Sequence, residues 1–273
     1  MNPPALTSPP ELRVAPNSGH AFGGILRLTV QRFRAPSQWV PLLLALAVLA
    51  LLAGAVIRDG RSPQYFRWAS EFYLNFLVPL LAFLSGGGAI RDELKSGAVD
   101  YILTRPVRRP AYVVFKFLSH LACIQVQFLL GLGVMLAVGH YRQIPGIWPV
   151  LPWLLLGQVI IVTAFSALGF LCGVLTSRFI VIGLFYGAIV EAGIGNIPIA
   201  LNRLSLTHQV KAMLQPFLPL APTVPVPIPV PVIVAPGPMA VTGFLLAYAV
   251  VMLAVAAAVF SLQELAGAKP SEG

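Results

Sequence analysis

The amino-acid sequence predicts an all-α, polytopic membrane protein, and three observations support this prediction. Hydrophobic residues make up 58% of the 273-residue chain and charged residues only 10%, whereas soluble domains carry about 25% charged residues. Several apolar runs reach the roughly 20 residues that a helix needs to cross a bilayer. Most charges lie between these runs. We therefore attribute the net charge of +9 to membrane topology, and we expect no nucleic acid as a partner, because the sequence holds no nucleic-acid-binding motif.

Six transmembrane spans are expected, the fourth and fifth joined only by a tight turn at Ser177 and Arg178. An even number of spans places both termini on the same side of the membrane. The connections on that side hold about twice as many Lys and Arg residues as those on the other side. The positive-inside rule therefore places both termini in the cytoplasm, with the protein in a cell membrane of the bacterial inner-membrane type. The predicted spans comprise residues 39–57, 72–90, 117–138, 150–176, 179–199 and 239–262.

Less apolar segments flank and connect the spans. Residues 1–19 are expected to form a disordered tail and residues 263–273 a cytoplasmic tail, on either side of one transmembrane domain over residues 20–262. A basic amphipathic helix is expected over residues 20–34, lying in the lipid headgroup layer. Within the external connection, residues 200–238, the stretch from Pro222 to Pro238 alternates proline with other residues, which favours an extended spacer over a helix. The amphipathic pattern consists of Phe22, Ile25, Leu26 and Phe33 among Arg27, Arg32 and Arg34.

The densest cluster of charges lies in the cytoplasmic connection between the second and third spans, residues 91–116. Apolar residues recur there every four positions from Ile90 to Ile102, which predicts a short amphipathic helix that continues from the second span. This helix should end before Pro106, because proline disfavours helical geometry in the preceding residue; Pro110 repeats the interruption. The positive-inside rule explains why this connection contains arginines, but it does not explain the acidic residues. A helix with both signs of charge suits docking to a cytoplasmic protein.

The stretch RDELKSGAVDYILTRPVRRPAYVVFKFL, residues 91–118, resembles the cytoplasmic loop of permease subunits of type-2 ABC exporters. That loop has acids at a helix start, a Ser-Gly pair, two aliphatic residues, a proline flanked by arginines and a lysine that opens the next span. The chain departs mildly at Ala98, Val99 and Asp100, where the family often has Thr or Leu-Glu. The six-span layout and residues 186–210 are also similar to the family. The matching loop positions are Asp92, Glu93, Ser96, Gly97, Ile102, Leu103, Arg105, Pro106, Arg109 and Lys116.

The resemblance implies the transmembrane permease subunit of an ABC exporter, whose cytoplasmic helix docks as a coupling helix on a separate ATPase. The implied partners are this cytoplasmic ABC ATPase, a second permease subunit (the same chain or a paralogue) and membrane lipid. ATP and Mg²⁺ are expected on the ATPase and no cofactor on this chain. The chain is not expected to be an enzyme, since it holds no GxxxxGK[ST] phosphate loop. The residues implied to couple to the ATPase are Arg91, Asp92, Glu93, Lys95, Ser96, Gly97, Asp100, Ile102, Leu103, Arg105, Pro106 and Arg109.

Two other functions stay open from the residues alone. One is a membrane scaffold or assembly protein. The other is a secondary transporter, which should show internal repeats with broken helices at matching positions; the first and last three spans show no convincing repeat. The sequence does not specify the substrate.

Polar residues within the apolar runs are candidates for a substrate path or gate. Glu191 is the only acidic residue deep in these runs, and it shares a helical stripe with Gly183, Gly187 and Gly195, on which another helix is expected to pack closely. It is either a gate residue or a carboxyl that bonds a neighbouring helix. Gly169 and Gly173 form a second GxxxG pair, which is also expected to serve helix packing. The amide candidates either line a polar route or bond helices together. The histidines and cysteines show neither metal-binding nor disulfide spacing, so no metal is expected. The candidates are Glu191, Gln125, Gln127, Gln158 and Asn75.

Overall fold

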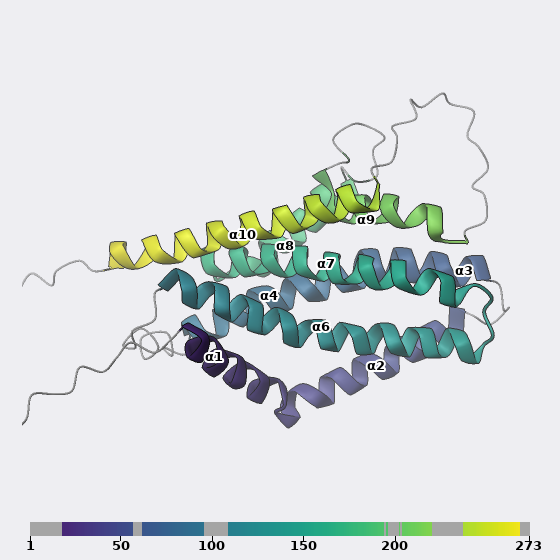
Figure 1. Cartoon of the computed structure of the whole chain (residues 1–273), viewed down its shortest axis with the longest axis horizontal. Helices are drawn as coiled ribbons and strands as arrows, with labels where there is room; N and C mark the ends of the chain where they lie inside the picture. The colour runs from purple at the N-terminus through teal and green to yellow at the C-terminus, as the bar shows by residue number, and fades with distance from the viewer. Residues whose placement is uncertain are drawn as a thin grey trace, which may run out of the picture.

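Every regular element in the part of the chain that the structure describes is a helix, as the sequence predicts (Figure 1). The computed structural model describes residues 18–56, 62–95, 109–193, 195, 202, 204–219 and 237–267. Most of both predicted tails and most of the proline-rich connection lie outside these residues.

The N-terminal part of the described chain contains two helical arms. Helix α1 covers Ser18–Phe33 and α2 covers Pro36–Val56, and the two meet in a V at one side of the bundle (Figure 1). Helix α3 (Ser62–Trp68) continues through a π-helical stretch, η1 (Ala69–Leu77), into α4 (Val78–Lys95). The first helix therefore begins two residues before its predicted start, inside the segment expected to be a tail.

The central part contains two long antiparallel helices. Helix α6 covers Arg109–Tyr141 and α7 covers Ile147–Leu175. The predicted tight turn at residues 176–178 follows, and then α8 (Phe179–Tyr186) continues as a π-helical stretch, η2 (Gly187–Gly193). In Figure 1, α4, α6, α7 and the C-terminal helix run side by side along the long axis of the molecule.

The connection before the C-terminal helix contains a short helix that the sequence did not predict, whereas the stretch expected to be extended, residues 222–238, lies almost entirely outside the described residues. The connection contains a nine-residue helix, α9 (Leu206–Leu214), and a 3-10 turn, η5 (Gln215–Phe217). Ser205 caps α9, because its Oγ accepts a hydrogen bond from the backbone N–H of His208 at 3.0 Å. The last helix, α10, then covers Pro238–Gly267 and so extends into the predicted C-terminal tail.

Four helices within the described residues are long and apolar enough to cross a membrane, so the chain is a multi-pass membrane protein. They correspond to the second, third, fourth and sixth predicted spans. The first and fifth predicted spans correspond to two shorter apolar stretches, Trp39–Ala55 and Phe179–Gly193, and the total of six stays a prediction. The four long apolar stretches are Pro63–Leu94, Arg109–Tyr141, Ile147–Leu175 and Pro238–Leu262.

The predicted charged connection, residues 91–116, is helical at both ends. Helix α4 runs on to Lys95, in agreement with a helix that continues from the second span, and α6 already begins at Arg109. The interruption predicted at Pro110 is wrong. This proline lies in the first turn of α6, where the N–H that it lacks would have had no partner inside the helix. Residues 96–108, which hold most of the predicted coupling helix, lie outside the described residues.

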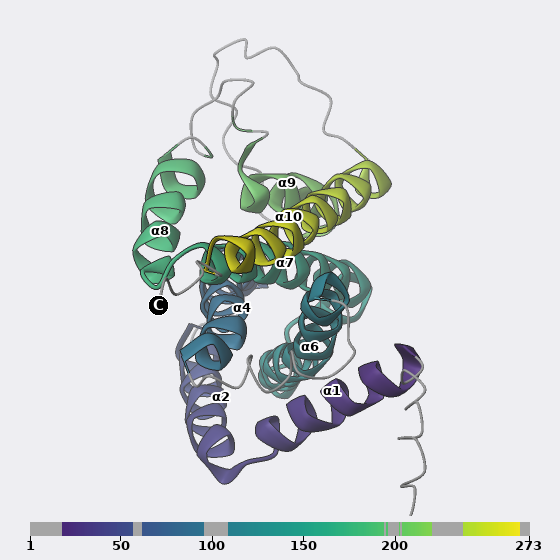
Figure 2. The same ribbon diagram turned by 90° about the vertical axis from the view of Figure 1, so that its left-hand side faces the viewer.

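Helix α7 is the centre of the bundle. It contacts α4, α6, α8, α9 and α10, and the end-on view places it between α4, α6 and α10, with α8 at the side (Figure 2). Its sequence has no polar face, which is typical of a helix buried all round. Side chains such as Leu154, Ile161 and Phe170 are buried along its whole length. Movements of the neighbouring helices therefore have to be accommodated by α7.

Helices α4 and α7 approach each other so closely that their contact leaves no room for a Cβ atom at three glycines. A Cβ built on Gly86 would lie 2.3 Å from the carbonyl oxygen of Ser166, and one built on Gly169 would lie 2.1 Å from that of Phe83. A Cβ on Gly173 would lie 2.5 Å from the carbonyl oxygen of Gly87. Small residues of this kind let membrane helices pack backbone to backbone. The GxxxG pair of α7 thus serves packing, as the sequence indicates.

Candidate functional site

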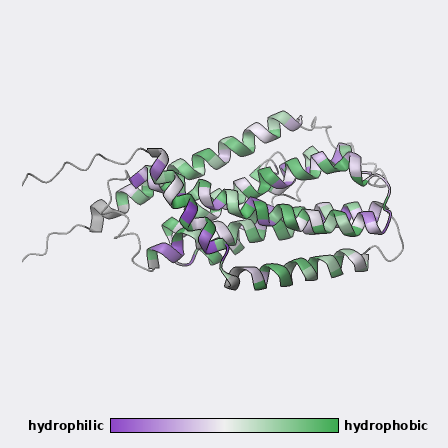
Figure 3. Cartoon of the chain, turned by 60° about the horizontal axis from the view of Figure 1, so that its bottom comes forward, coloured by the Kyte–Doolittle hydropathy of each residue, from purple (hydrophilic) through white to green (hydrophobic). Residues whose placement is uncertain are grey.

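The ends of α4 and α6 that lead into residues 96–108 form a charged cluster that we call the α4–α6 root. It consists of Arg91, Asp92 and Glu93 in the last turns of α4 and of Tyr112 and Lys116 in the first turns of α6. Hydrophilic residues gather at this end of the molecule, whereas the middles of the helices are mostly hydrophobic (Figure 3). The root therefore lies where the apolar bundle meets the predicted coupling segment.

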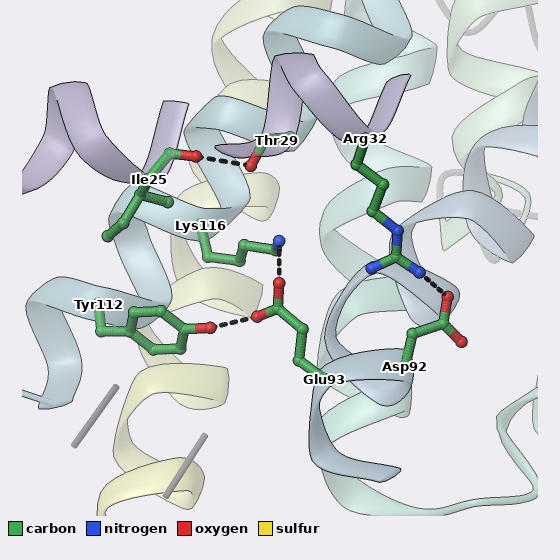
Figure 4. A network of polar contacts seen from close by, with 7 residues as sticks. All are labelled: Ile25, Thr29, Arg32, Asp92, Glu93, Tyr112 and Lys116. Carbon is green, nitrogen blue, oxygen red and sulfur yellow. Dashed lines mark hydrogen bonds and ion pairs between the residues drawn. The ribbon is translucent and has the colours of Figure 1, made fainter. Parts of the chain in front are cut away.

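Glu93 points into the interface between α4 and α6. Its carboxylate accepts a hydrogen bond from the Tyr112 hydroxyl and forms an ion pair with the Lys116 ammonium (Figure 4). The side chains of Lys116 and Glu93 are only 7% and 16% exposed, and Tyr112 is buried. A charged side chain that is largely buried is stable only when it is paired, because burial has removed its hydration. The three residues thus cross-link the two helices at their charged ends.

Asp92, the neighbouring acid, points the other way. It accepts a hydrogen bond from Nη2 of Arg32 in α1 at 2.5 Å, and the two side chains are 54% and 47% exposed (Figure 4). An ion pair this exposed contributes about 0–1 kcal/mol to stability, because water screens it. Asp92 therefore ties α1 to the root only weakly.

Helix α1 is attached mainly through apolar contacts with α6. The ring of Phe22 meets that of Phe115, and the ring of Phe33 meets that of His120, each with centroids 5.5 Å apart. Two of the side chains expected to face the lipid headgroup layer thus pack on protein instead. The sequence could not distinguish these two environments, because both favour apolar residues on one face of a basic helix.

The residues predicted to couple to an ATPase divide into two groups. Arg91, Asp92, Glu93, Lys95 and Arg109 lie in the described helices, at the two ends of the root. The others lie outside the described residues, and their docking role stays a prediction: Ser96, Gly97, Asp100, Ile102, Leu103, Arg105 and Pro106.

The amide candidates for a substrate path lie at contacts between helices. Gln125 of α6 donates from Nε2 to the backbone oxygen of Val159 in α7 at 2.9 Å. Gln158 of α7 is fully buried and accepts a hydrogen bond from the Tyr73 hydroxyl of η1 at 2.7 Å. Within the described residues, three buried atoms of this group have no hydrogen-bond partner: Asn75 Oδ1, Gln125 Oε1 and Gln158 Nε2. Gln125 and Gln158 thus bond helices together and keep spare hydrogen-bonding capacity. Gln127 is half-buried on α6, and a path role for the four amides stays a prediction.

Glu191 of η2 binds the start of α9. One carboxylate oxygen accepts hydrogen bonds from Ser205 Oγ at 2.6 Å and from both the backbone N–H and Oγ1 of Thr207, and the other accepts from the backbone N–H of Leu206 at 3.1 Å. A carboxylate at this position satisfies N–H groups that have no partner inside the helix, and it interacts favourably with the helix dipole. The geometry is that of a carboxyl that bonds a neighbouring helix.

The glycine stripe around Glu191 is in contact at only some of its positions. A Cβ on Gly183 would lie 2.2 Å from the ring of Phe83, and one on Gly195 would lie 2.8 Å from Ser205 Oγ. Nothing lies within 4 Å of such an atom on Gly187. The expected close packing along the whole stripe is therefore found at its two ends and not in its middle.

Comparison with known proteins identifies the family of the chain. A family model described as ABC-2 family transporter protein matches residues 24–265, which extends from α1 almost to the end of α10. The chain belongs to the ABC-2 transporter family. This match confirms the resemblance to type-2 ABC permease subunits that the sequence of the charged loop indicates. No curated protein matches the chain at a significant level.

In this ABC-2 family protein, sequence reasoning missed the role of Lys116 and Tyr112. Lys116 was noted only as the residue that opens the third span, and the tyrosine had no part in the expected site. Their partner Glu93 lies 19 and 23 residues earlier in the chain, so no local pattern joins them. The sequence offers no signal for this role, because the predicted span begins only at residue 117, and the structure alone places Lys116 two turns inside a helix that begins at Arg109, where an unpaired charge would be costly.

The cap that Glu191 forms leads to a prediction for this transporter-family protein. The variant Glu191→Ala is expected to lower the stability by about 1–3 kcal/mol, because it leaves several donors at the start of α9 without their charged acceptor. The apparent melting temperature of the detergent-solubilised protein measures this. Glu71→Ala is a matched control, since Glu71 also binds α9, through Lys211 at 3.4 Å, but in an exposed pair worth less than about 1 kcal/mol. Equal losses in both variants would contradict the cap.

Proposed function

We propose that the protein is the transmembrane permease subunit of an ABC exporter and that a separate cytoplasmic ATPase supplies the energy. One observation carries this proposal beyond the family match: two of the long apolar helices, α4 and α6, end in a charged root from which the predicted coupling segment, residues 96–108, emerges. In such an arrangement, a displacement of the coupling segment would act directly on two spans, α4 and α6. ATP and Mg²⁺ would bind to the ATPase, and no covalent chemistry would fall to this chain.

Transport would follow from alternation between two states of the complex. Binding of ATP draws two ATPase subunits together and displaces the coupling segments docked on them. The displacement moves α4 and α6, and α7, which contacts both, has to repack. The higher affinity of ATP for the closed state supplies the free energy. Two permease subunits, identical or paralogous, would face each other across the path that opens outward.

The proposed topology has six spans, with α2 and the α8–η2 stretch as the first and fifth. Helix α2 has 21 residues, which gives it a length of about 31 Å, enough for the hydrocarbon core. The positive-inside rule then supports a cytoplasmic position for both termini and for the α4–α6 root. The polar amides of α6 and α7 and the α9 connection would lie along or above the path.

Copurification from detergent-solubilised membranes tests this proposal. The tagged wild-type protein is expected to bring down an ATPase subunit, and a variant that combines Gly97→Trp with Asp100→Arg in the coupling segment is expected to lose it. Glu93 is left unchanged, because a substitution at this largely buried residue would affect folding as well as docking. The matched control reverses a charge at the exposed Arg142, at the opposite end of α6, in Arg142→Glu.

The outcomes separate the candidate functions. Loss of the ATPase in the coupling-segment variant alone, with normal membrane insertion, supports the permease subunit. If the wild type brings down no ATPase from membranes in which other membrane complexes stay intact, the proposal is wrong. A scaffold or a secondary transporter would then account better for the chain.

A further inference from the structure

Two adjacent acids at the end of α4 have different surroundings. Asp92 is about half exposed and reaches outward to Arg32, whereas Glu93 is 16% exposed and reaches inward to Tyr112 and Lys116. A side chain that is used inside the protein in this way is not available as a docking contact for another subunit. Glu93 therefore needs a role that differs from that of the surface residues of the coupling segment.

The position of Glu93 along the chain indicates this role. It lies two residues before the end of α4 at Lys95, and its partners Tyr112 and Lys116 lie about one and two turns after the start of α6 at Arg109. The cross-link thus joins the two helices directly behind the connecting segment, residues 96–108. Without it, a force on that segment could spread the two helix ends apart. With it, the two ends have to move together.

The cross-link is also continuous with a buried apolar cluster that reaches two further helices. Tyr112 packs against Phe260 of α10 with ring centroids 6.4 Å apart. Ile90, one turn before Glu93, is fully buried in the same cluster, which includes Phe170 of α7. Close-packed interiors transmit displacement because they have little free volume. A movement of the root is therefore passed to α7 and α10.

We propose that Glu93 is a positioning residue for energy coupling: through Tyr112 and Lys116 it joins the ends of α4 and α6 into one rigid unit, so that displacement of the coupling segment moves both helices and, through them, α7 and α10. This inference rests on the proposed function. It assigns docking to the surface of residues 96–108 and transmission to the buried side of the root. Loss of Glu93 should then leave the ATPase bound but separate its movement from that of the spans.

The test measures docking and movement in the same preparation. The complex with its ATPase is purified, and spin labels are placed at the exposed Tyr141 and Met239, which are 84% and 91% exposed at the far ends of α6 and α10. The two native cysteines, Cys123 and Cys172, are first replaced by alanine. One position is labelled at a time on both permease subunits of the complex, and the change in distance between the two labels is recorded with and without ATP and vanadate. The variants are Glu93→Ala and, as a control, Arg32→Ala, which removes the exposed ion pair of the neighbouring acid Asp92.

The wild type and Arg32→Ala are expected to show the same nucleotide-dependent change. Glu93→Ala is expected to keep its ATPase at wild-type yield and to lose at least about half of that change, in line with the effect of single residues on coupling between distant sites. If Glu93→Ala does not fold, Glu93→Gln together with Lys116→Met removes the ion pair without leaving a buried charge, and the same loss is expected from it.

Three results would decide against the proposal. A full nucleotide-dependent change in the variants that lack the ion pair would show that the cross-link does not transmit movement. Loss of the ATPase from Glu93→Ala but not from Arg32→Ala would make Glu93 a docking residue. Failure of the wild type to bind an ATPase at all would overturn the proposed function and this inference together, and the copurification step separates that failure from the other two.

Discussion

A single methyl group added at Gly86 is expected to destabilise the protein, whereas the same methyl group at Gly88, two residues further along α4, is expected to be neutral or stabilising. The Cβ of Gly86→Ala would lie 2.3 Å from the carbonyl oxygen of Ser166, and no atom lies within 4 Å of the Cβ of Gly88→Ala. Overpacking against a rigid backbone costs about 1–3 kcal/mol or more. An alanine in place of an unpacked helical glycine contributes up to about 1 kcal/mol in stability.

The apparent melting temperatures of the two variants in the same detergent test this prediction, because helix propensity changes equally in both. A second variant on the facing helix, Gly169→Ala, should be as damaging as Gly86→Ala, since its Cβ would lie 2.1 Å from the carbonyl oxygen of Phe83. The double variant should lose less than the sum of the two single losses, because helices already forced apart leave room for the second methyl group. Equal stability of Gly86→Ala and Gly88→Ala would rule out the close approach of α4 and α7.

Those parts of the fold that depend on hydrophobicity could be predicted from the sequence. Apolar runs predicted α7 and α10 to within about five residues at each end, although α6 begins eight residues before its predicted span, and the GxxxG pair Gly169 and Gly173 predicted a close helix contact. The partner of that pair could not be predicted, because Gly86 and Gly87 lie about 80 residues away in a segment whose glycines could equally well have bent a helix. The residue pattern of a sequence indicates which face of a helix packs against another element, but the tertiary fold determines which element that is.

Element boundaries in polar sequence were less predictable. Helix α9 was missed because its apolar stripe (Leu206, Val210, Met213 and Leu214) is short and stands next to a proline-rich stretch. Ser205 is an available N-cap signal, but its capping geometry also depends on Glu191, which lies 14 residues earlier. Sequence reasoning identified Glu191 as unusual and left two roles open. Only the geometry of the carboxylate, with its hydrogen bonds to the start of α9, favours one of them.

The charged root shows a further limit of sequence reasoning. Adjacent acids in an otherwise basic loop were both assigned to a surface that docks another protein. The α-helix turns by about 100° per residue, so neighbouring residues face in different directions. Asp92 lies on the solvent side and Glu93 on the side of α6. The resemblance to the family identified the correct region, but it could not separate residues that dock from residues that hold the region together.

The variant Lys116→Met is expected to lower stability by about 3–5 kcal/mol, because it leaves the carboxylate of Glu93 largely buried without its ionic partner. The double variant Glu93→Gln with Lys116→Met should recover most of this loss, since replacing both charges by side chains of similar volume removes the desolvation penalty together with the pair. Chemical or thermal unfolding of the four species in one double-mutant cycle measures the coupling between the two residues.

The matched control for this cycle is the exposed pair at the same end of the bundle. Arg32→Ala, which frees Asp92, should cost less than about 1 kcal/mol, because both of these side chains stay in contact with water. Two ion pairs on adjacent residues of one helix would then differ several-fold in their effect on stability for one physical reason, the water that each charge retains. If the double variant is no more stable than Lys116→Met, the carboxylate of Glu93 is not confined by its surroundings, and the cross-link between α4 and α6 must rest on the packing of Tyr112 and Ile90 instead.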